Sequence, residues 1–554
     1  MPARRAVALC IAAGLIVPQL ALVAPAESGS APTRPRPSMH LARPIGGPDG
    51  SGISRTGAQL VRRGYLVPDP AGYSRAKAAL AAPTGRSATP TRAATATTPR
   101  VARSFNGTFD PRVTPPDATG AAGPARYVEL VNTKFAIYKR DGTKLSAGDL
   151  GVLTGMGAGF PYLTDPQIIW DPGTRRFYYV VLDFDVAGRS SSTNGVDFAF
   201  GFSKMASPSR ARDWCKYTLS YGYDVPHSRR MLGDQPHLGD TADYLLWGMN
   251  VFDLSFGVRF RGADVAWVSK PPAGRRCPRP AAFSLGNTRH LRTAGGARAF
   301  TPVVANQVDG SHTGWIVAAR HLAAASSRAR TLSVFRVSPS PHGAVVQRRA
   351  RAISVPHYGF PPPAPQAGTF RTLDTLDGRL TQAVAAVDPS RRRVVVWTQH
   401  AIRGRAGSIV RWYEIDPAHH RVVHEGDVSD PVLWAYNGAI APDRVVRKGV
   451  HRFGRSMVLG FNTSSDSTDA AVQMVSKVPR HPQSAFVLVR RSHGPDVDFS
   501  CRDGTCRWGD YSGASPDPAA ARTGARGRVW LTNQWNVRNR SGVDWRTVNW
   551  RAAP

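Results

Sequence analysis

The sequence predicts an all-β protein built as a β-propeller, in which similar sheets are arranged around one axis. Three observations support this prediction. A small, polar strand, a short turn and an aromatic-rich strand recur together at intervals of about 50 to 80 residues, which is typical of a radial array of sheets. Apolar and polar residues alternate, with almost no helical periodicity. The pattern occupies residues 105–554, which is too long for a sandwich.

Seven copies of this pattern predict seven blades. The clear copies are residues 165–184, 380–399 and 511–535. The fainter copies are residues 117–132, 234–250, 301–320 and 436–462. Six blades are the alternative, because the copies at 301 and 436 are degenerate. Small residues in the first strand of a copy, such as Ala383 to Ala386, suit the crowded axis, and the aromatic second strand suits the space between blades.

Residues 1–26 have the features of a secretory signal peptide. Arg4 and Arg5 provide a positive start, Ala6 to Leu22 a short apolar run, and Ala24-Pro25-Ala26 a small-residue cleavage pattern. The run is too short and too broken for a stable membrane span; a retained anchor is the alternative. We expect a secreted, extracellular monomer that keeps no transmembrane anchor after cleavage.

Residues 27–104 are rich in Pro, Ala and Arg and poor in large apolar side chains. Such a segment buries too little surface to offset its ordering entropy, so we expect a disordered extension or a pro-segment. Within it, Asp69-Pro70 is a start signal for a short helix near residues 70–82. This helix either belongs to a pro-segment or docks on the propeller domain, residues 105–554.

Four cysteines are left once Cys10 is removed with the signal peptide. Cys501 and Cys506 enclose a tight CRDGTC loop with an Asp-Gly turn signal, which makes them natural partners. Cys215 and Cys277 then pair by elimination and would join two adjacent repeats. A metal site at the CxxxxC pair is the alternative, but no second close pair of Cys or His completes a tetrahedral shell. We therefore predict two disulfides.

The formal net charge of +34 is carried mostly by arginine and is spread along the chain. A basic balance can indicate contact with nucleic acid, an anionic wall polymer or a membrane. No basic helix and no interleaved basic and aromatic stripe marks nucleic-acid recognition, and the Arg and Ala content also fits the codon bias of a high-GC genome. We expect no nucleic-acid partner.

The acidic residues indicate where chemistry could take place. The chain has only four glutamates, so a glycosidase-type pair of carboxylates must use aspartates, Glu414 or Glu425. Aspartates stand at or near the start of the first strand in several copies. These residues are Asp165, Asp234, Asp377 and Asp510, with Asp117 and Asp430 in similar places. In a propeller such positions converge on one mouth of the central channel.

Three roles are open for these aspartates. An Asp before Pro or Gly commonly accepts hydrogen bonds from its own turn, which would make them structural. A ring of carboxylates could instead bind a hard cation such as Ca²⁺, with Asp165, Asp234 and Asp510 as ligands. It could also transfer protons, because crowded carboxylates split their pKa values. No other cofactor is expected.

Two arginines accompany the aspartates, Arg379 in LDGRLTQ and Arg507 in CRWGDYSG. Their guanidinium groups could clamp an anion or form ion pairs between blades. Metal-binding spacing is absent among four histidines of the repeat region, His227, His237, His357 and His400. No nucleophile elbow, P-loop or dinucleotide-binding motif stands in a suitable context.

Four stretches carry a resemblance to a known family: residues 117–142, 162–181, 234–252 and 506–518. They resemble secreted bacterial β-propeller proteins that are common in actinobacteria and are loosely grouped with sialidase-like, or BNR-repeat, propellers. The resemblance covers most of residues 105–540 and implies a fold, but little about activity. Sialidase signatures are missing. Arg112 precedes Val113 and not Ile-Pro, and VDGSHTGW (308–315) lacks the Ser-x-Asp start of an Asp-box.

Two functions follow from these features. The first is a binding module that recognises a glycan, a cell-wall polymer or a protein with one face, using aromatic side chains that we expect to be exposed in loops: Trp214, Tyr221 and Tyr223. The alternative is a glycoside hydrolase or lyase in which the channel-mouth aspartates act as catalysts and Arg379 or Arg507 holds an anionic group. The missing catalytic motifs favour binding.

Overall fold

The computed structural model describes residues 39–43, 66–81, 97–157, 163–184, 195–223, 231–272, 274, 276–501, 504–520, 526–537 and 545–554. All of them belong to one compact unit, residues 37–554. The predicted signal peptide, residues 1–26, lies outside the described residues. Among the helices that are described, none is long and apolar enough to cross a membrane.

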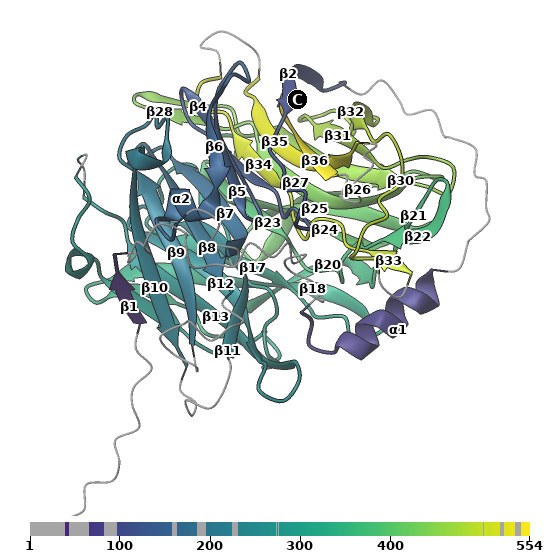
Figure 1. Ribbon diagram of the computed structural model, residues 1–554, viewed down its shortest axis with the longest axis horizontal. Coiled ribbons are helices and arrows are strands. Elements are labelled where there is room, and N and C mark those ends of the chain that lie inside the picture. Colours follow the sequence, from purple (N-terminus) through teal and green to yellow (C-terminus); the bar gives the residue numbers. More distant parts are fainter. Residues whose placement is uncertain are drawn as a thin grey trace, which may run out of the picture. The chain divides into compact units, whose positions relative to one another are not determined.

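The described chain is almost entirely β-structure, and seven of its sheets have four or five strands (Figure 1). The first contains β3 (Thr119–Ala122), β4 (Arg126–Val131), β5 (Lys134–Lys139) and β6 (Lys144–Asp149). The second contains β7 (Leu163–Asp171), β8 (Arg176–Asp183), β9 (Gly195–Ser203), β10 (Trp214–Gly222) and β1 (Met39–Ala42). The third contains β11 (Met231–Asp240), β12 (Tyr244–Asp253), β13 (Arg259–Ser269) and β14 (Leu285–Thr288).

The remaining four large sheets follow in chain order. The fourth contains β15 (Val303–Val304), β17 (Gly314–Ala319), β18 (Arg328–Ser340), β19 (Gly343–Val346) and β20 (Arg351–Gly359). The fifth contains β16 (Asn306–Gln307), β23 (Gln382–Asp388), β24 (Arg393–Arg403), β25 (Ser408–Asp416) and β26 (Arg421–Val428). The sixth contains β27 (Trp434–Pro442), β30 (Met457–Ser464), β31 (Ala471–Lys477) and β32 (Val487–Arg491). The seventh contains β34 (Gly513–Pro516), β35 (Val529–Asn536), β36 (Trp545–Ala553) and β2 (Arg100–Asn106).

The smaller elements lie between these sheets in the chain. Two small sheets consist of β21 (Ala364–Gln366), β22 (Thr369–Leu373) and β33 (Thr505–Cys506), and of β28 (Val445–Arg447) and β29 (Val450–Arg452). The helices are α1 (Pro70–Leu80), α2 (Leu150–Thr154) and the 3₁₀ turns η1 (Ala211–Asp213) and η2 (Pro280–Ala282).

The first strands of the seven sheets form a closed ring. They contact one another in the order β3, β7, β11, β15, β23, β27 and β34, and β34 contacts β3 again. Within each large sheet the chain mostly meanders between antiparallel neighbours, while the short strand β16 continues from β15 and pairs in parallel with β23 of the next sheet. Sheets that radiate from a ring of first strands are the arrangement of a β-propeller, and the all-β prediction is confirmed.

Small residues line the axis because the first strands approach one another closely there. A Cβ added to Gly513 of β34 would lie 2.7 Å from the backbone nitrogen of Gly120 in β3. The alanines of β23 and β3 are buried in the same region. Larger side chains would therefore force the first and last sheets apart, which explains the small-residue half of the sequence repeat.

Aromatic and aliphatic side chains fill the spaces between neighbouring sheets. One buried cluster joins the second and third sheets and includes Phe198 and Trp247, whose rings lie 5.7 Å apart in an edge-to-face arrangement. Another joins the fifth and sixth sheets around Trp397 and Trp412, which stack at 6.0 Å. Burial of such side chains is the main favourable term in folding, so the core is divided into layers between sheets.

The ring is closed by an N-terminal strand. The sequence suggests that the terminal VDWRTVNW stretch (543–550) could pair with the first blade. Instead, β36 lies inside the seventh sheet, and β2 pairs along its outer edge. Buried Glu129 of the first sheet accepts hydrogen bonds from the seventh sheet's Thr547 and Thr532. Strand pairing and this buried carboxylate together hold the first and last sheets.

Three segments from the region 27–104 belong to the same compact unit as the sheets, although this region is predicted to be a disordered extension or a separate pro-segment. Strand β1 pairs with the edge strand β10, and β2 pairs with β36. Helix α1 begins at the Asp69 cap, whose carboxylate accepts a hydrogen bond from the backbone nitrogen of Gly72. Unpaired strand edges are favourable places for such additions, because their backbone groups are available for hydrogen bonding.

Helix α1 docks through one buried lysine. Lys77 is 4 % exposed, donates hydrogen bonds to the Thr375 hydroxyl (2.8 Å) and to the Leu376 carbonyl (2.6 Å), and lies 3.2 Å from the Asp374 carboxylate. Tyr73 of α1 also donates to Asp374. The helix that the sequence predicts therefore contacts the segment that leads from β22 to β23 (Figure 1).

The two predicted disulfides are present. Cys215 pairs with Cys277, and Cys501 pairs with Cys506. Cys215 lies in β10 of the second sheet, while Cys277 follows β13 of the third sheet. The first bond therefore joins adjacent sheets, as the sequence predicts.

We expect Lys77→Met to lower the free energy of unfolding by about 3 kcal/mol or more, because it leaves the Asp374 carboxylate buried without its cation. Urea unfolding measures the loss. Lys144→Met, a change at an exposed lysine of β6, is the matched control and should stay within about 0.5 kcal/mol of the wild type. The double variant Lys77→Met/Asp374→Asn should recover part of the loss; equal stability of Lys77→Met and the control would contradict the docking role.

Candidate functional site

The same backbone feature recurs where the first strands begin. Near six of these starts a residue other than glycine has a positive φ: Asp117 (46°), Asp165 (51°), Gln235 (54°), Thr301 (46°), Leu376 (62°) and Asn437 (50°). This conformation is uncommon for such residues. In β7, β11 and β27 it coincides with a β-bulge, where the register of pairing shifts. The bulges locally interrupt the regular pairing at the start of these three first strands.

Side-chain amides connect these starts from sheet to sheet. Asn132 of the first sheet accepts a hydrogen bond from the backbone nitrogen of Asp165 at 2.9 Å. Asn250 of the third accepts one from Thr301 at 2.7 Å. Gln399 of the fifth donates to the Gly438 carbonyl of the sixth at 2.5 Å. Each amide serves the first strand of the following sheet, because buried backbone groups need partners.

The sequence carries a signal for these amides that was missed. Four of the seven copies of the repeat end in Asn or Gln, namely Asn132, Asn250, Gln399 and Asn462, and a fifth has Asn533-Gln534 just before its last residue. Asn462 also reaches the seventh sheet, but at its second strand: it accepts a hydrogen bond from the Trp508 indole (2.9 Å) and donates one to the Gln534 carbonyl (2.9 Å) of β35. A polar residue that repeatedly ends a buried strand indicates a structural hydrogen bond.

Three of the aspartates near the strand starts form one buried cluster. Asp117 accepts a hydrogen bond from the backbone nitrogen of Asp510 at 2.7 Å. Gln235 joins the other two, because its backbone nitrogen donates to the Asp165 carboxylate at 3.3 Å and its side-chain amide to Asp510 at 3.4 Å. Arg507 forms an ion pair with Asp510. The cluster thus contains two of the predicted site aspartates and Asp117.

The predicted residues Asp377 and Arg379 adjoin this cluster. Two nitrogens of the Arg379 guanidinium donate to the two oxygens of Asp377, each at 2.9 Å. A third nitrogen donates to the side chain of Gln235. The guanidinium carbon lies 4.6 Å from the centre of the Phe300 ring. Arg379 is only 2 % exposed; its ion pair with Asp377 is local in the chain, and its hydrogen bond to Gln235 reaches the third sheet.

The other predicted aspartates are placed differently. Asp234 precedes Gln235 in β11 and pairs in backbone register with Asn250 of the same sheet. Asp430 accepts hydrogen bonds from the backbone nitrogens of Val432 and Leu433 in its own turn, away from the axis. Asp430 therefore has a structural role, because its carboxylate caps its own turn.

Burial and mutual repulsion control the charge of the cluster. Burial and the nearby Asp510 and Asp165 carboxylates raise the pKa of Asp117 well above its usual value. Burial raises the pKa of Asp510 to about 6, although Arg507 opposes the shift. At Asp377 the Arg379 guanidinium outweighs burial and lowers the pKa. The cluster therefore contains carboxyl groups that hold protons more strongly than ordinary aspartates.

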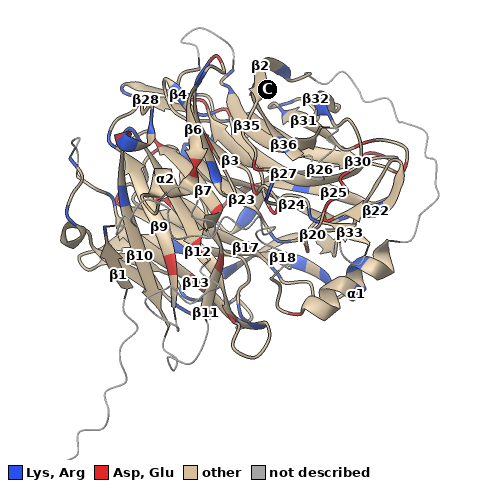
Figure 2. Cartoon of the chain, in the orientation of Figure 1, with Lys and Arg blue, Asp and Glu red and all other residues tan. Residues whose placement is uncertain are grey.

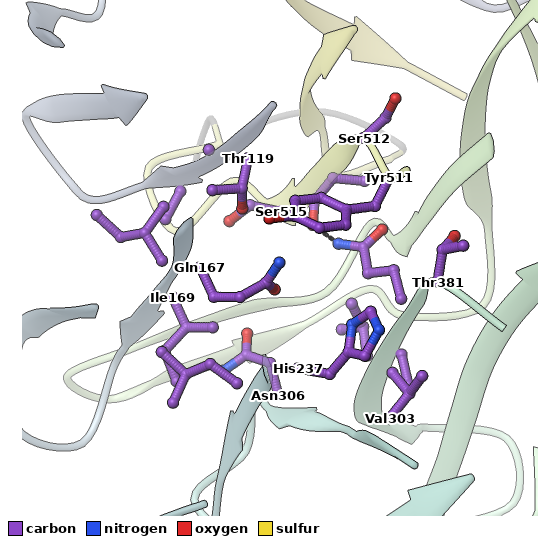
Figure 3. Close-up of a pocket in the computed structure, with 18 of the residues that line it drawn as sticks. Thr119, Gln167, Ile169, His237, Val303, Asn306, Thr381, Tyr511, Ser512 and Ser515 are labelled. Atoms are coloured by element: carbon purple, nitrogen blue, oxygen red, sulfur yellow. Dashed lines mark hydrogen bonds between the residues drawn. The ribbon is translucent and has the colours of Figure 1, made fainter. Parts of the chain in front are cut away.

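The axis below the cluster is a narrow channel lined by first strands (Figure 3). Its cavity volume is only about 30 Å³. His237 and Tyr511 face each other there with ring centres 6.1 Å apart. Burial lowers the pKa of His237 to about 3, so the imidazole is neutral. Within the described chain its Nε2 has no hydrogen-bond partner.

The described residues contain no suitable set of ligands for a metal ion. No group of three or more His, Cys, Asp or Glu side chains there is placed to hold a metal ion. The oxygens of Asp510 are instead contacted by Arg507 and Gln235, which are hydrogen-bond donors. The Ca²⁺ site suggested at Asp165, Asp234 and Asp510 does not match this geometry, because a cation needs oxygen ligands that face one point.

The aromatic residues expected in exposed loops are buried. Trp214 and Tyr221 lie in β10 with 2 % and 0 % exposure, and Tyr223 follows the strand with 5 %. Tyr221 donates a hydrogen bond to the Asp264 carboxylate of the next sheet at 2.8 Å. The prediction was wrong because residues 214–222 form strand β10 of the second sheet and not a loop. Its large side chains therefore pack in the core.

Comparisons with known proteins reveal only distant folds. No family model matches the sequence, and no curated protein matches it. A Synechocystis apocarotenoid oxygenase variant is 13 % identical (TM-score 0.37; 68 % of this chain and 72 % of that one). The hemagglutinin-neuraminidase of parainfluenza virus 5 is 9 % identical, with a TM-score of 0.33 over 73 % of this chain and 91 % of that chain. A Trypanosoma rangeli sialidase variant is 8 % identical, with a TM-score of 0.34 over 75 % of this chain and 56 % of that chain. These likenesses carry no argument about activity.

We expect Asn250→Ala to lower the free energy of unfolding by about 1 to 3 kcal/mol, because it leaves the buried backbone nitrogen of Thr301 without an acceptor. Chemical unfolding measures the change. Asn287→Ala in β14, where the half-buried side chain accepts one hydrogen bond from Arg289, is the matched control. A loss no larger than that of the control would show that the amide does not hold the two sheets together.

We expect Asp510→Asn to gain stability relative to the wild type as the pH rises. The pKa of Asp510 is about 6 in the folded chain, above the ordinary 3.8, so the unfolded chain loses this proton first and the wild type is destabilised between these values. The difference between the two proteins should move by about 3 kcal/mol in favour of the variant from pH 4 to pH 7. Unfolding at several pH values measures it; a constant difference would contradict the raised pKa.

Proposed function

We propose that the protein is a secreted, seven-bladed β-propeller that acts as an extracellular binding module for a glycan, a cell-wall polymer or a protein. In this proposal each of the seven large sheets is one blade, and the N-terminal strand β2 completes the last blade. The two disulfides support export, since such bonds form and persist in oxidising compartments.

One observation carries the choice of binding over catalysis. The carboxylates at the axial end accept hydrogen bonds from the protein's own amides, guanidinium groups and backbone. Lys77 of α1 and its partner Asp374 lie close to them in space, since Asp374 raises the pKa of Asp510, and Asp377 raises the pKa of Lys77 against the effect of burial. These groups are fully engaged in holding the blades together, which favours a structural role.

Exposed side chains on the blades offer contact surface. Phe256, between β12 and β13, is 71 % exposed, and Phe370 of β22 is 84 % exposed. Arginines and lysines are spread over many strands rather than gathered on one face (Figure 2). Exposed aromatic rings are typical anchors in interfaces, and they replace the buried aromatics as candidates for ligand contact.

A second candidate function is hydrolysis or elimination on a glycan. It is favoured by the raised pKa values of Asp117 and Asp510, since a general acid must hold its proton near neutral pH. In this alternative Asp165, Asp234, Asp377 and Asp510 remain the candidate catalytic residues, and Arg379 or Arg507 holds the anionic group.

A glycan array and a panel of chromogenic glycosides separate the two functions. We expect the purified protein to bind an array component or a wall polymer without turning over any glycoside. Asp510→Asn and Asp234→Asn should then bind as the wild type does, provided that they fold. Turnover by the wild type that disappears in either variant would establish the enzyme and end the pure binding proposal.

A further inference from the structure

A second cavity lies between the fifth and sixth sheets, away from the axial cluster. Its volume is about 230 Å³, and it is lined by residues from β24, β25, β26 and the end of β31. Cavities that hold small organic ligands typically measure about 300 to 1,000 Å³. This cavity is smaller, so it has room for an anionic end group rather than for a whole larger ligand.

One wall of this cavity is a row of three side chains across the fifth sheet. Trp397 of β24 lies opposite Glu414 of β25, which lies opposite His424 of β26. Residues in such register point to the same face of a sheet. Glu414 is 3 % exposed, and its carboxylate lies 2.6 Å from Nδ1 of His424. The only acidic group of the row is thus already matched by a partner.

Cations surround the rest of the cavity. Its lining contains four basic side chains, Arg391, Arg455, Lys477 and Arg480, and two carboxylates, Asp388 and Glu414. Asp388 is paired with Arg391 at 3.2 Å. Arg455 and Arg480 form no ion pair with any residue in the described chain, and both are exposed. The cavity therefore has an excess of positive charge that no protein group neutralises.

The half-buried Lys477 points to an anionic ligand. Its ammonium donates a hydrogen bond to the Val478 carbonyl at 3.1 Å. Burial lowers the pKa of Lys477, and the Glu414 carboxylate offsets only part of this effect. An oxyanion in the cavity would stabilise the charged form of this lysine.

We propose that this cavity, which we call the blade-edge pocket, binds a small organic anion or anionic end group, whose carboxylate or phosphate pairs with Lys477, Arg455 and Arg480. The inference rests on the proposed binding function and specifies the chemistry of its ligand as an acidic sugar unit. Arginine and lysine are the usual partners of such oxyanions.

Isothermal titration calorimetry of the full chain tests the pocket with four probes: glucuronate, glucose 6-phosphate, inorganic phosphate and uncharged glucose. We expect saturable binding of glucuronate or glucose 6-phosphate and none of glucose. The stronger of the two identifies a carboxylate or a phosphate as the source of the charge. Inorganic phosphate should compete with the stronger probe. No binding of either charged sugar at about 10 mM would overturn the proposal.

Variants locate the binding. Arg455→Gln/Arg480→Gln should weaken binding of the stronger probe about 10-fold to 100-fold, because it removes two of the cations that face the oxyanion. Arg330→Gln, a change at an exposed arginine of β18, is the matched control. The arginine variant changes exposed residues only, so its fold should be kept, and circular dichroism checks this. Binding that is equal in the arginine variant and the control would overturn the proposal.

The same variants separate this inference from the proposed function. If array binding persists unchanged in Arg455→Gln/Arg480→Gln, the binding module is correct and the blade-edge pocket is wrong. If the charged sugars bind in the pocket but no polymer or array component is bound, the pocket is correct and the proposed function is wrong.

Discussion

The fold depends on hydrogen bonds that pass from each sheet to the next around the axis. The first strands lie at or near the edges of their sheets, next to the crowded axis. Near the start of six of them, a residue other than glycine has a positive φ. Backbone groups there are buried and need partners. Asn132, Asn250, Gln399 and Asn462 supply them across the sheet boundary. Without such bonds each inter-sheet layer would have to bury unsatisfied polar groups, at a cost of about 1 to 3 kcal/mol each.

This constraint also explains why the axial carboxylates are poor evidence for catalysis. Asp117 and Asp165 accept hydrogen bonds from Asp510 and Gln235 of neighbouring sheets, in the same way as the amides do. Their crowding raises pKa values as a consequence of closing the ring. The blade-edge pocket differs, because its exposed arginines form no ion pair within the described chain. Unmatched charges, rather than perturbed pKa values, distinguish a ligand site here.

Particular residues show how far the sequence could be interpreted. The clustering of Asp165 with Asp510 followed from their equivalent places in the repeat, and the cysteine pairs followed from spacing. The amides that end the copies were visible but were not interpreted, because a single Asn in a strand has many explanations. Tyr221 was predicted to be exposed in a loop, because a buried aromatic strand and an aromatic loop can have the same composition. The docking of α1 rests on Lys77, whose partner Asp374 is almost 300 residues away.

The sequence by itself determined the all-β class, the recurrence of the sheets, the two disulfides and the position of one helix, because each depends on residues that are close in the chain or repeat at regular intervals. Only the tertiary structure decided which charges are matched. Lys77 and Asp374 pair across almost 300 residues, the Gln235 amide that contacts both Asp510 and Arg379 comes from another sheet, and the pocket beside Trp397 is formed by two sheets together. Electrostatic energies depend on distance and burial, and neither is contained in local sequence pattern.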